Sequence, residues 1–454
     1  MNKAVPVWVL LLCLLLGALF TMVFGWSVKS TLAGNDSSSY FGKAAVMIAS
    51  FPTMVKTVFT DVKVDTVSKD ETIRVPRTRA DLTNFAAIRA RPGIDVKGLV
   101  MHADPAAILR APGWRILVGV FTIDGEVKNA ALALSPDLEI TRIWHLTESA
   151  IGDKQPRPPH RKFIHGFDIM DDGSVIFSFD GGISLQRFDI CGSRIWGVGA
   201  GFHHSVTLDD SQEFAWTLVD SSLAKIATAN GEIIQLISMD DIITANPTID
   251  ILEIRKHDES DLGGNSRNTY EKWQADYFHL NDVDPLPAAL ASRFDGFEAG
   301  DLLVSARSLN LIFVLDPDTL EVKWWRTGAT KRQHDPDWGT TGEITVFDNR
   351  MSRDYSQFVS ISPASYRTKV IFDGRINNFY TRIRGKHQFT ENGTLLITSS
   401  QEGRVFEVLP DGDTVLEIFN TKPGSDEFNY TISQAIWLPP DTFSFPEGGT
   451  LCAN

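Results

Sequence analysis

The chain has 454 residues, of which 43% are hydrophobic and 22% charged, so its composition is that of a globular protein and excludes a disordered or collagen-like chain. Acidic residues outnumber basic ones by 57 to 43, and the net charge of −14 argues against a nucleic acid as partner, because such a surface repels phosphate groups. The three cysteines, Cys13, Cys191 and Cys452, are too few for a disulfide scaffold or a cysteine-rich zinc site.

The first predicted element is a membrane-spanning helix. Residues 4–26 contain no charged side chain, and about 20 apolar residues rising ~1.5 Å each cross a hydrocarbon layer of ~30 Å. The run is longer than the apolar part of a cleaved signal peptide, roughly 7–15 residues, so we expect an uncleaved signal anchor. Because Lys3 precedes the run, the positive-inside rule favours an extracytoplasmic location, periplasmic, lumenal or extracellular, for the rest of a single-pass membrane protein.

Residues 29–112 differ in character from what precedes and follows them. The polar stretch GNDSSS at 34–39 is followed by an apolar segment broken at Pro52 and then by a charged stretch. We therefore expect three parts: a cytoplasmic stub and anchor at 1–28, a stalk or adaptor at 29–112, and a folded domain at 113–454. With this topology Cys191 and Cys452 lie outside the cytosol and could pair, a question that the sequence leaves open.

From residue 114 onward the chain is typical of an all-β fold. Short apolar runs alternate with turn pairs such as Asp124-Gly125, Asp172-Gly173 and Asn392-Gly393. Five similar segments each place a histidine before a turn and a strand: His165, His204, His279, His334 and His387.

The spacings of these histidines are 39, 75, 55 and 53 residues, which lie near the repeat of a propeller blade once loop insertions are allowed. The strand pair at 116–135 adds a sixth unit. We therefore predict a six-bladed β-propeller, in which residues 433–443 return to complete one sheet and so remove its free edges. The first strand of each blade lines the axis of a propeller, so the five histidines are expected to converge there. The alternative is that each histidine only makes structural hydrogen bonds, which is the more typical role of a single histidine in a blade.

The most specific stretch contains five motifs in order. They are Phe278-His279-Leu280-Asn281, Ser305-Ala306-Arg307, a strand pair that ends at Trp324, Gln333-His334 and Phe347-Asp348-Asn349. In this order the motifs resemble those of the arylsulfotransferase family, closely over residues 270–350 and more loosely over 160–430. The resemblance implies a six-bladed propeller. It also implies transfer of a sulfuryl group from a phenolic sulfate ester to a phenol, by a ping-pong mechanism through a sulfohistidine, without the nucleotide sulfate donor. We expect no cofactor and no metal.

The resemblance also implies roles for particular residues. His334 would be the nucleophile, His279 and His204 would exchange protons with the two phenols, and Asn281 would donate to a sulfate oxygen. A neutral imidazole can attack sulfur directly, and covalent catalysis then divides one difficult exchange into two easier ones. His203 adjoins His204, and the sequence leaves open which of the two faces the axis.

Two further candidates follow from residue chemistry. Arg307 carries a planar, permanent charge that fits the oxygens of a sulfate, and transfer of a sulfuryl group is expected to need such a cationic clamp. Asp335 follows the nucleophile and is a candidate to fix the tautomer of its imidazole. His165 and His387 occupy equivalent repeat positions outside the matched motifs and are expected to be structural.

Alternative functions come from other classes of protein. A membrane-anchored propeller could bind a ligand or a protein partner without catalysis, and a calcium-dependent hydrolase could share the fold. Joint presence of His279, Asn281, Arg307 and His334 favours the enzyme over a binding module, and histidine at the repeated position argues against the calcium type. The expected partners are a small aryl sulfate, a phenol and, through the N-terminal helix, the membrane. A homo-oligomer is a further option.

Overall fold

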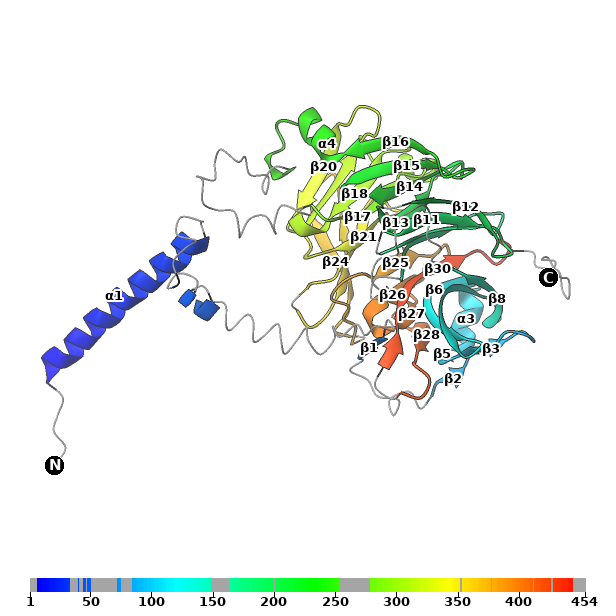
Figure 1. Cartoon of the computed structure of the whole chain (residues 1–454), viewed down its shortest axis with the longest axis horizontal. Coiled ribbons are helices and arrows are strands. Elements are labelled where there is room, and N and C mark those ends of the chain that lie inside the picture. The colour runs from blue at the N-terminus through cyan, green and yellow to red at the C-terminus, as the bar shows by residue number, and fades with distance from the viewer. Residues whose placement is uncertain are drawn as a thin grey trace. The chain divides into compact units, whose positions relative to one another are not determined.

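The computed structural model describes residues 6–32, 40, 44–45, 47–49, 72–74, 84–147, 163–180, 182–199, 201–252, 278–351, 353–376, 378–410, 412–425 and 428–443 (Figure 1). The chain divides into two units, one formed by Met1–Asp61 with Ile251–Tyr277 and the other by Val62–Asp250 with Phe278–Asn454. Cys452 lies outside the described residues; Cys191 is disulfide-bonded and Cys13 is free.

In the first unit, the apolar N-terminal run forms helix α1 (Val7–Leu32). Its segment Val7–Lys29 is long and apolar enough to cross a membrane, and no residue of its most apolar 18-residue stretch is buried against protein. Leu14, for example, is 71% exposed, which a core helix of a soluble domain would not allow. The predicted apolar helix is confirmed, and it is consistent with single-pass anchoring in a membrane.

In the second unit, antiparallel sheets form a six-bladed β-propeller, which confirms the predicted all-β fold (Figure 1). Blade 1 consists of β9 (Ile164–Ile169), β10 (Val175–Phe179), β11 (Ser184–Phe188) and β12 (Arg194–Gly199). Blade 2 consists of β13 (Phe202–Leu208), β14 (Phe214–Val219), β15 (Ser222–Ala227) and β16 (Ile233–Ser238). Blade 3 consists of β17 (Leu280–Pro285), β18 (Leu302–Ala306), β19 (Leu311–Leu315) and β20 (Val322–Thr327).

The remaining blades follow the same meander. Blade 4 consists of β21 (His334–Trp338), β22 (Ile344–Asp348), β23 (Gln357–Ile361) and β24 (Thr368–Asp373). Blade 5 consists of β25 (Lys386–Phe389), β26 (Leu395–Ser399), β27 (Arg404–Val408) and β28 (Thr414–Asn420). Blade 6 consists of β30 (Ile432–Leu438), β6 (Trp114–Ile123), β7 (Glu126–Leu134) and β8 (Glu139–His145).

The ring is closed by β30, which pairs antiparallel with β6 from Ile432↔Gly119 to Leu438↔Trp114. The predicted return of the C-terminal tail to complete one sheet is therefore confirmed. Gly119 is required at this junction, because a Cβ there would lie 2.5 Å from the carbonyl oxygen of Thr431. Closure joins strands from the two ends of the propeller and removes the free edge of β6.

Strands from residues 86–103, inside the predicted stalk, extend two of the blades. In blade 5, β5 (Leu99–Ala103) pairs with β28 and β2 (Ala86–Ala87) pairs with β5. In blade 6, β3 (Arg89–Ala90) pairs with β8, while β4 (Val96–Lys97) pairs with β6. Strands β5 and β3 cover the outer edges of β28 and β8, which would otherwise stay open. The domain boundaries predicted from the sequence stay a prediction.

Short helices occur in the connections. They are α3 (Pro105–Arg110), α4 (Met239–Ala245) and α6 (Ala288–Ala291). The small sheet of β1 (Thr72–Arg74) and β29 (Phe428–Tyr430) completes the described strands.

The hydrophobic core lies between neighbouring blades. One cluster joins Ile312 of blade 3 to Val346 of blade 4, and another joins Phe358 of blade 4 to Phe406 of blade 5. Because each sheet buries both faces, its central strands carry continuous apolar runs rather than an alternating pattern. This stacking fixes the inner strands, which hold the candidate site.

Candidate active site

The inner strands share one irregularity. In five of the six inner strands that the structure describes, the register with the next strand shifts at a β-bulge, located at His165, His204–Ser205, Asn281, Asp335 and Ser433. A bulge adds a residue that the ladder does not pair and so changes the direction of nearby side chains. The left-handed backbone of His204 (φ 59°) and Asp335 (φ 51°) accompanies two of these bulges.

A cluster of imidazoles lies at the N-terminal ends of three inner strands. The ring centroids of His165 and His204 are 4.1 Å apart, and those of His204 and His279 are 5.1 Å apart. His204 is therefore the central member. The ring of His203 contacts His204 through their Nδ1 atoms at 2.5 Å, while its Nε2 lies 2.8 Å from the carbonyl oxygen of Asp220. His204 contacts the imidazoles of both neighbouring blades.

His165 joins this cluster although it lies outside the family motifs. Its Nδ1 lies 3.0 Å from Oδ1 of Asp180, and its ring packs on that of His204. The signal for its position was the repeat itself, since His165 and His204 occur at the start of successive inner strands.

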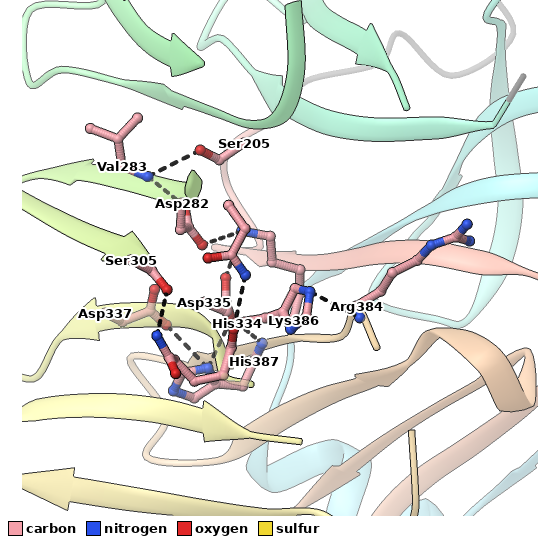
Figure 2. Close-up of polar contacts among 12 residues, drawn as sticks. Ser205, Asp282, Val283, Ser305, His334, Asp335, Asp337, Arg384, Lys386 and His387 are labelled. Atoms are coloured by element: carbon pink, nitrogen blue, oxygen red, sulfur yellow. Dashed lines mark hydrogen bonds and ion pairs between the residues drawn. The ribbon is translucent and has the colours of Figure 1, made fainter. Parts of the chain in front are cut away.

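His334 is held by contacts that fix its tautomer. Its Nδ1 lies 2.6 Å from Oδ1 of Asn349, and the Nδ2 group of Asn349 donates to the carbonyl oxygens of Thr381 and Arg384. Because the amide orientation is set by those two carbonyls, Nδ1 of His334 must be the donor to Oδ1. The backbone N–H of Arg384 donates to Nε2 of His334 at 3.1 Å, so the lone pair of the ring is at Nε2 (Figure 2).

Arg307 is close enough to two of these imidazoles to affect their ionisation. Burial lowers the pKa of His204 and of His334 well below the usual value, and the guanidinium of Arg307 lowers both pKa values further. Burial also lowers the pKa of His165 to about 4. The three rings are therefore neutral at physiological pH. Arg307 directly follows β18, and its backbone N–H donates to the carbonyl oxygen of His279 at 3.1 Å.

Asn281 links two of the family motifs. Its Nδ2 donates to the carbonyl oxygen of Gln333 at 2.8 Å, and its side chain is buried. Among the described residues its Oδ1 has no hydrogen-bond partner. Gln333 in turn donates to Oγ of Ser305. The motifs that contain Asn281, Ser305 and Gln333 therefore meet in one hydrogen-bond network.

The expectation for Asp335 is wrong. Its carboxylate does not contact the imidazole of His334; it accepts from Nδ1 of His387 at 2.8 Å and from the ammonium of Lys386 at 2.7 Å (Figure 2). The bulge at Asp335 turns this carboxylate away from its neighbour. His387, which is expected to be structural, contacts Oγ1 of Thr345 through its Nε2 at 2.9 Å.

A second polar cluster, which the sequence did not predict, lines a cavity of about 300 Å³ with residues from all six inner strands. Burial raises the pKa of Asp168 to about 6 and those of Asp284 and Asp337 well above the usual value. The available signal was the alternation Asp-Val-Asp at 282–284, which puts two carboxylates on one face of β17.

Within the part of the chain that the structure describes, two groups of side chains have donor atoms close enough together to hold a metal ion: His165, Asp180 and His204; and Asp335, Asp337 and His387. In the second group the ammonium of Lys386 already neutralises Asp335.

The chain was compared with curated proteins, solved structures and protein families. No curated protein matches the chain. Among solved structures, a protein of unknown function from Bacteroides caccae is 12% identical and has a TM-score of 0.46, with 72% of this chain and 98% of that chain covered. Virginiamycin B lyase from Staphylococcus aureus is 9% identical and has a TM-score of 0.35, with 61% and 84% covered.

The family model for arylsulfotransferase (ASST) matches residues 166–421, a region that extends from the first blade to the fifth. It includes His204 and His279 of the histidine cluster, Arg307 and the His334–Asn349 contact. The match covers more than half of the sequence, and the chain therefore belongs to the arylsulfotransferase family.

Proposed function

We propose that this protein is an aryl-sulfate sulfotransferase that transfers a sulfuryl group from a phenolic sulfate ester to a phenol by a ping-pong mechanism, with His334 as the nucleophile. The observation that carries the proposal is the state of His334. Its ring is neutral, its Nδ1–H donates to Asn349, and its lone pair is at Nε2. The positive charge of Arg307 also lowers the pKa of this ring.

In the first half-reaction, the lone pair on Nε2 forms a bond to sulfur while the bond from sulfur to the phenolic oxygen breaks. The phenolate leaves with the bonding pair, and the sulfuryl group stays on the ring as a sulfohistidine. Nε2 has to exchange the N–H of Arg384 for sulfur, a net cost of about 1 kcal/mol for one hydrogen bond. Nδ1 keeps its proton and its bond to Asn349 throughout.

In the second half-reaction, an acceptor phenol loses its proton as its oxygen attacks sulfur. Burial and neighbouring imidazoles hold the pKa of His204 low, so this ring is neutral and available as a base or as a hydrogen-bond donor to the phenolate. His279 lies beside it and is the alternative. Charge on the peripheral oxygens of the sulfuryl group would be stabilised by Arg307 and by Asn281.

The test is turnover by the full-length chain in detergent with 4-nitrophenyl sulfate as donor and a phenol as acceptor. We expect release of nitrophenol that depends on the acceptor and is abolished in His334→Gln, while His102→Gln, an exposed histidine on β5, keeps full activity. Donor alone should leave an adduct of sulfuryl mass on His334.

Two other outcomes would redirect the proposal. An adduct on His204 or His279 would reassign the nucleophile. Absence of both turnover and adduct over a panel of aryl sulfates would favour the second candidate, a non-catalytic propeller that binds a ligand or a protein.

We also propose that α1 anchors the propeller on the extracytoplasmic side of the membrane. A protease added to intact cells should degrade the propeller, whereas a cytoplasmic propeller would be cut only after permeabilisation.

A further inference from the structure

The ammonium of Lys386 connects three inner strands through two ion pairs. From β25, its Nζ lies 2.7 Å from Oδ1 of Asp335 on β21 and 2.9 Å from Oδ2 of Asp282 on β17 (Figure 2). Its side chain is only 20% exposed, and those of Asp282 and Asp335 are 4% and 5% exposed. Burial of charged groups costs free energy, which is offset only when their ion-pair and hydrogen-bond partners are well placed.

Each end of this bridge is next to a residue of the candidate site. Asp282 follows Asn281 and Asp335 follows His334 in the sequence. The bridge therefore lies one residue from two side chains that the proposed reaction needs, on the two strands that carry them.

Because of the bulges in β17 and β21, the positions of Asn281 and His334 depend on contacts other than the hydrogen bonds between strands. In β17 the paired residues are Leu280 and Asp282, which leaves Asn281 unpaired. In β21 the paired residues are His334 and Pro336, which leaves Asp335 unpaired. A bulged residue has lost its partner across the strands, so side-chain contacts must hold the local backbone.

Lys386 also balances the charge around it. Asp282 and Asp335 repel each other, and the ammonium opposes the effect of burial on both carboxyl groups. The pKa of Asp335 is lowered to about 2 because Lys386 and His387 outweigh burial. Without the ammonium, the two carboxylates would move apart or take up a proton. The described titratable groups that line this cavity are Asp168 on β9, Asp282 and Asp284 on β17, Asp335 and Asp337 on β21, and Lys386 and His387 on β25.

We propose that Lys386 is a positioning residue for sulfuryl transfer: it holds the bulged strands β17 and β21 together so that Asn281 and His334 keep their alignment. The assignment rests on the proposed function, but the alignment itself can be measured without it.

The test compares Lys386→Met with Lys323→Met in the full-length chain. Lys323 is a matched control, because its ammonium also bridges two carboxylates, Asp301 at 2.8 Å and Asp316 at 3.5 Å, on outer parts of blade 3. We expect Lys386→Met to lower kcat by about 10- to 100-fold with little change in KM, since misplacement of reacting groups costs that much. Lys323→Met should keep the wild-type kcat.

The pH profile separates this role from a general loss of stability. Once the ammonium is gone, the pKa values of Asp282 and Asp335 rise, and a proton shared between them can replace the bridge at acidic pH. The ratio of the kcat of Lys386→Met to that of the wild type should therefore increase as pH falls, and the ratio for Lys323→Met should not. The double variant Lys386→Met/Asp282→Asn removes the repulsion between Asp282 and Asp335 and should recover part of kcat. It can replace the single variant in the test if Lys386→Met does not fold.

Hydrogen–deuterium exchange gives a readout that needs no turnover. Peptides that contain β17 and β21 should exchange faster in Lys386→Met, and those of blade 2 should not. Wild-type kcat together with unchanged exchange in these strands would overturn the assignment. If the wild type turns over no aryl sulfate, the proposed function fails, and the exchange data still decide whether Lys386 aligns the two strands.

Discussion

Nδ1 of His334 and Oδ1 of Asn349 lie 2.6 Å apart, although His334 begins β21, Asn349 lies after the end of β22, and the two residues belong to different family motifs. Asn349 directly follows β22, and its Nδ2 group holds the segment that carries Arg384. One amide thus determines both which ring nitrogen has the proton and which backbone N–H faces the other nitrogen.

Replacement of Asn349 should therefore impair catalysis more than binding. In Asn349→Ala the Nδ1–H of His334 loses its acceptor, and the ring can adopt the other tautomer or rotate. We expect kcat for nitrophenol release to fall by roughly 10²- to 10⁴-fold, in the range seen when a catalytic histidine loses its orienting partner. Steady-state kinetics would check this, with Asn392→Ala in an exposed turn as the control. A kcat within threefold of the wild type would contradict the role.

Arg307→Met should change both the rate and its pH dependence. Loss of a charged donor to the sulfuryl oxygens is expected to lower kcat by about 10²- to 10³-fold. Arg307 also lowers the pKa of His204 and of His334, so its removal lets both pKa values rise. The neutral rings would then be protonated at a higher pH, and the acidic limb of kcat/KM should move upward. The exposed Arg375, which pairs with Asp373, is a control whose loss should leave the profile in place.

The histidine cluster should make the fold sensitive to acid. The folded pKa of His165 is about 4, below the value of 6.5 for an unperturbed side chain. Between these two values the unfolded chain binds the proton and the folded chain does not, so stability decreases as pH falls from about 6.5 towards 4. His165→Gln should reduce this loss by about 2 kcal/mol, measured by urea unfolding at pH 7 and pH 4.5. An equal loss in wild type and variant would count against the low pKa.

The buried pair of Arg115 and Glu407 should be important for stability. Both side chains are 0% exposed, and the pair connects blade 6 to blade 5 with N–O distances of 2.8 and 3.0 Å. Arg115→Met leaves an uncompensated carboxylate in the core and should lower the free energy of unfolding by about 3–5 kcal/mol. Glu407→Gln added to this variant should restore part of the loss. Lys128→Met, which breaks an exposed pair with Glu126, should cost no more than about 1 kcal/mol in the same urea titration.

The sequence was informative where the signal was local or repeated. Asp124-Gly125 and Asp172-Gly173 are turns between consecutive strands of blades 6 and 1, with the positive φ that Gly adopts readily. Such hairpin signals depend on neighbouring residues alone. The return of β30 was predictable for a different reason, because a propeller with an open sheet edge is unfavourable.

The direction of side chains at bulges was not predictable. Alternation along β21 predicts where Asp335 points only if the strand is regular, and the bulge with its positive φ breaks that pattern. His387 has the same repeat position as the other histidines, but β25 has no such register shift and its ring contacts Asp335 and Thr345. The pairing of residues 86–103 with blades 5 and 6 had no local signal, since these strands are two to five residues long.

The pairing of β30 with β6 also determines when the protein can finish folding. Residues 432–438 are synthesised more than 300 positions after the strand that they complete, whereas α1 emerges first and can enter the membrane early. Until the last inner strand arrives, β6 offers unsatisfied backbone groups to any other chain nearby. With α1 as the anchor proposed above, a nascent molecule would be tethered to a bilayer while its circular array is still incomplete, and binding by a chaperone during that interval would limit aggregation.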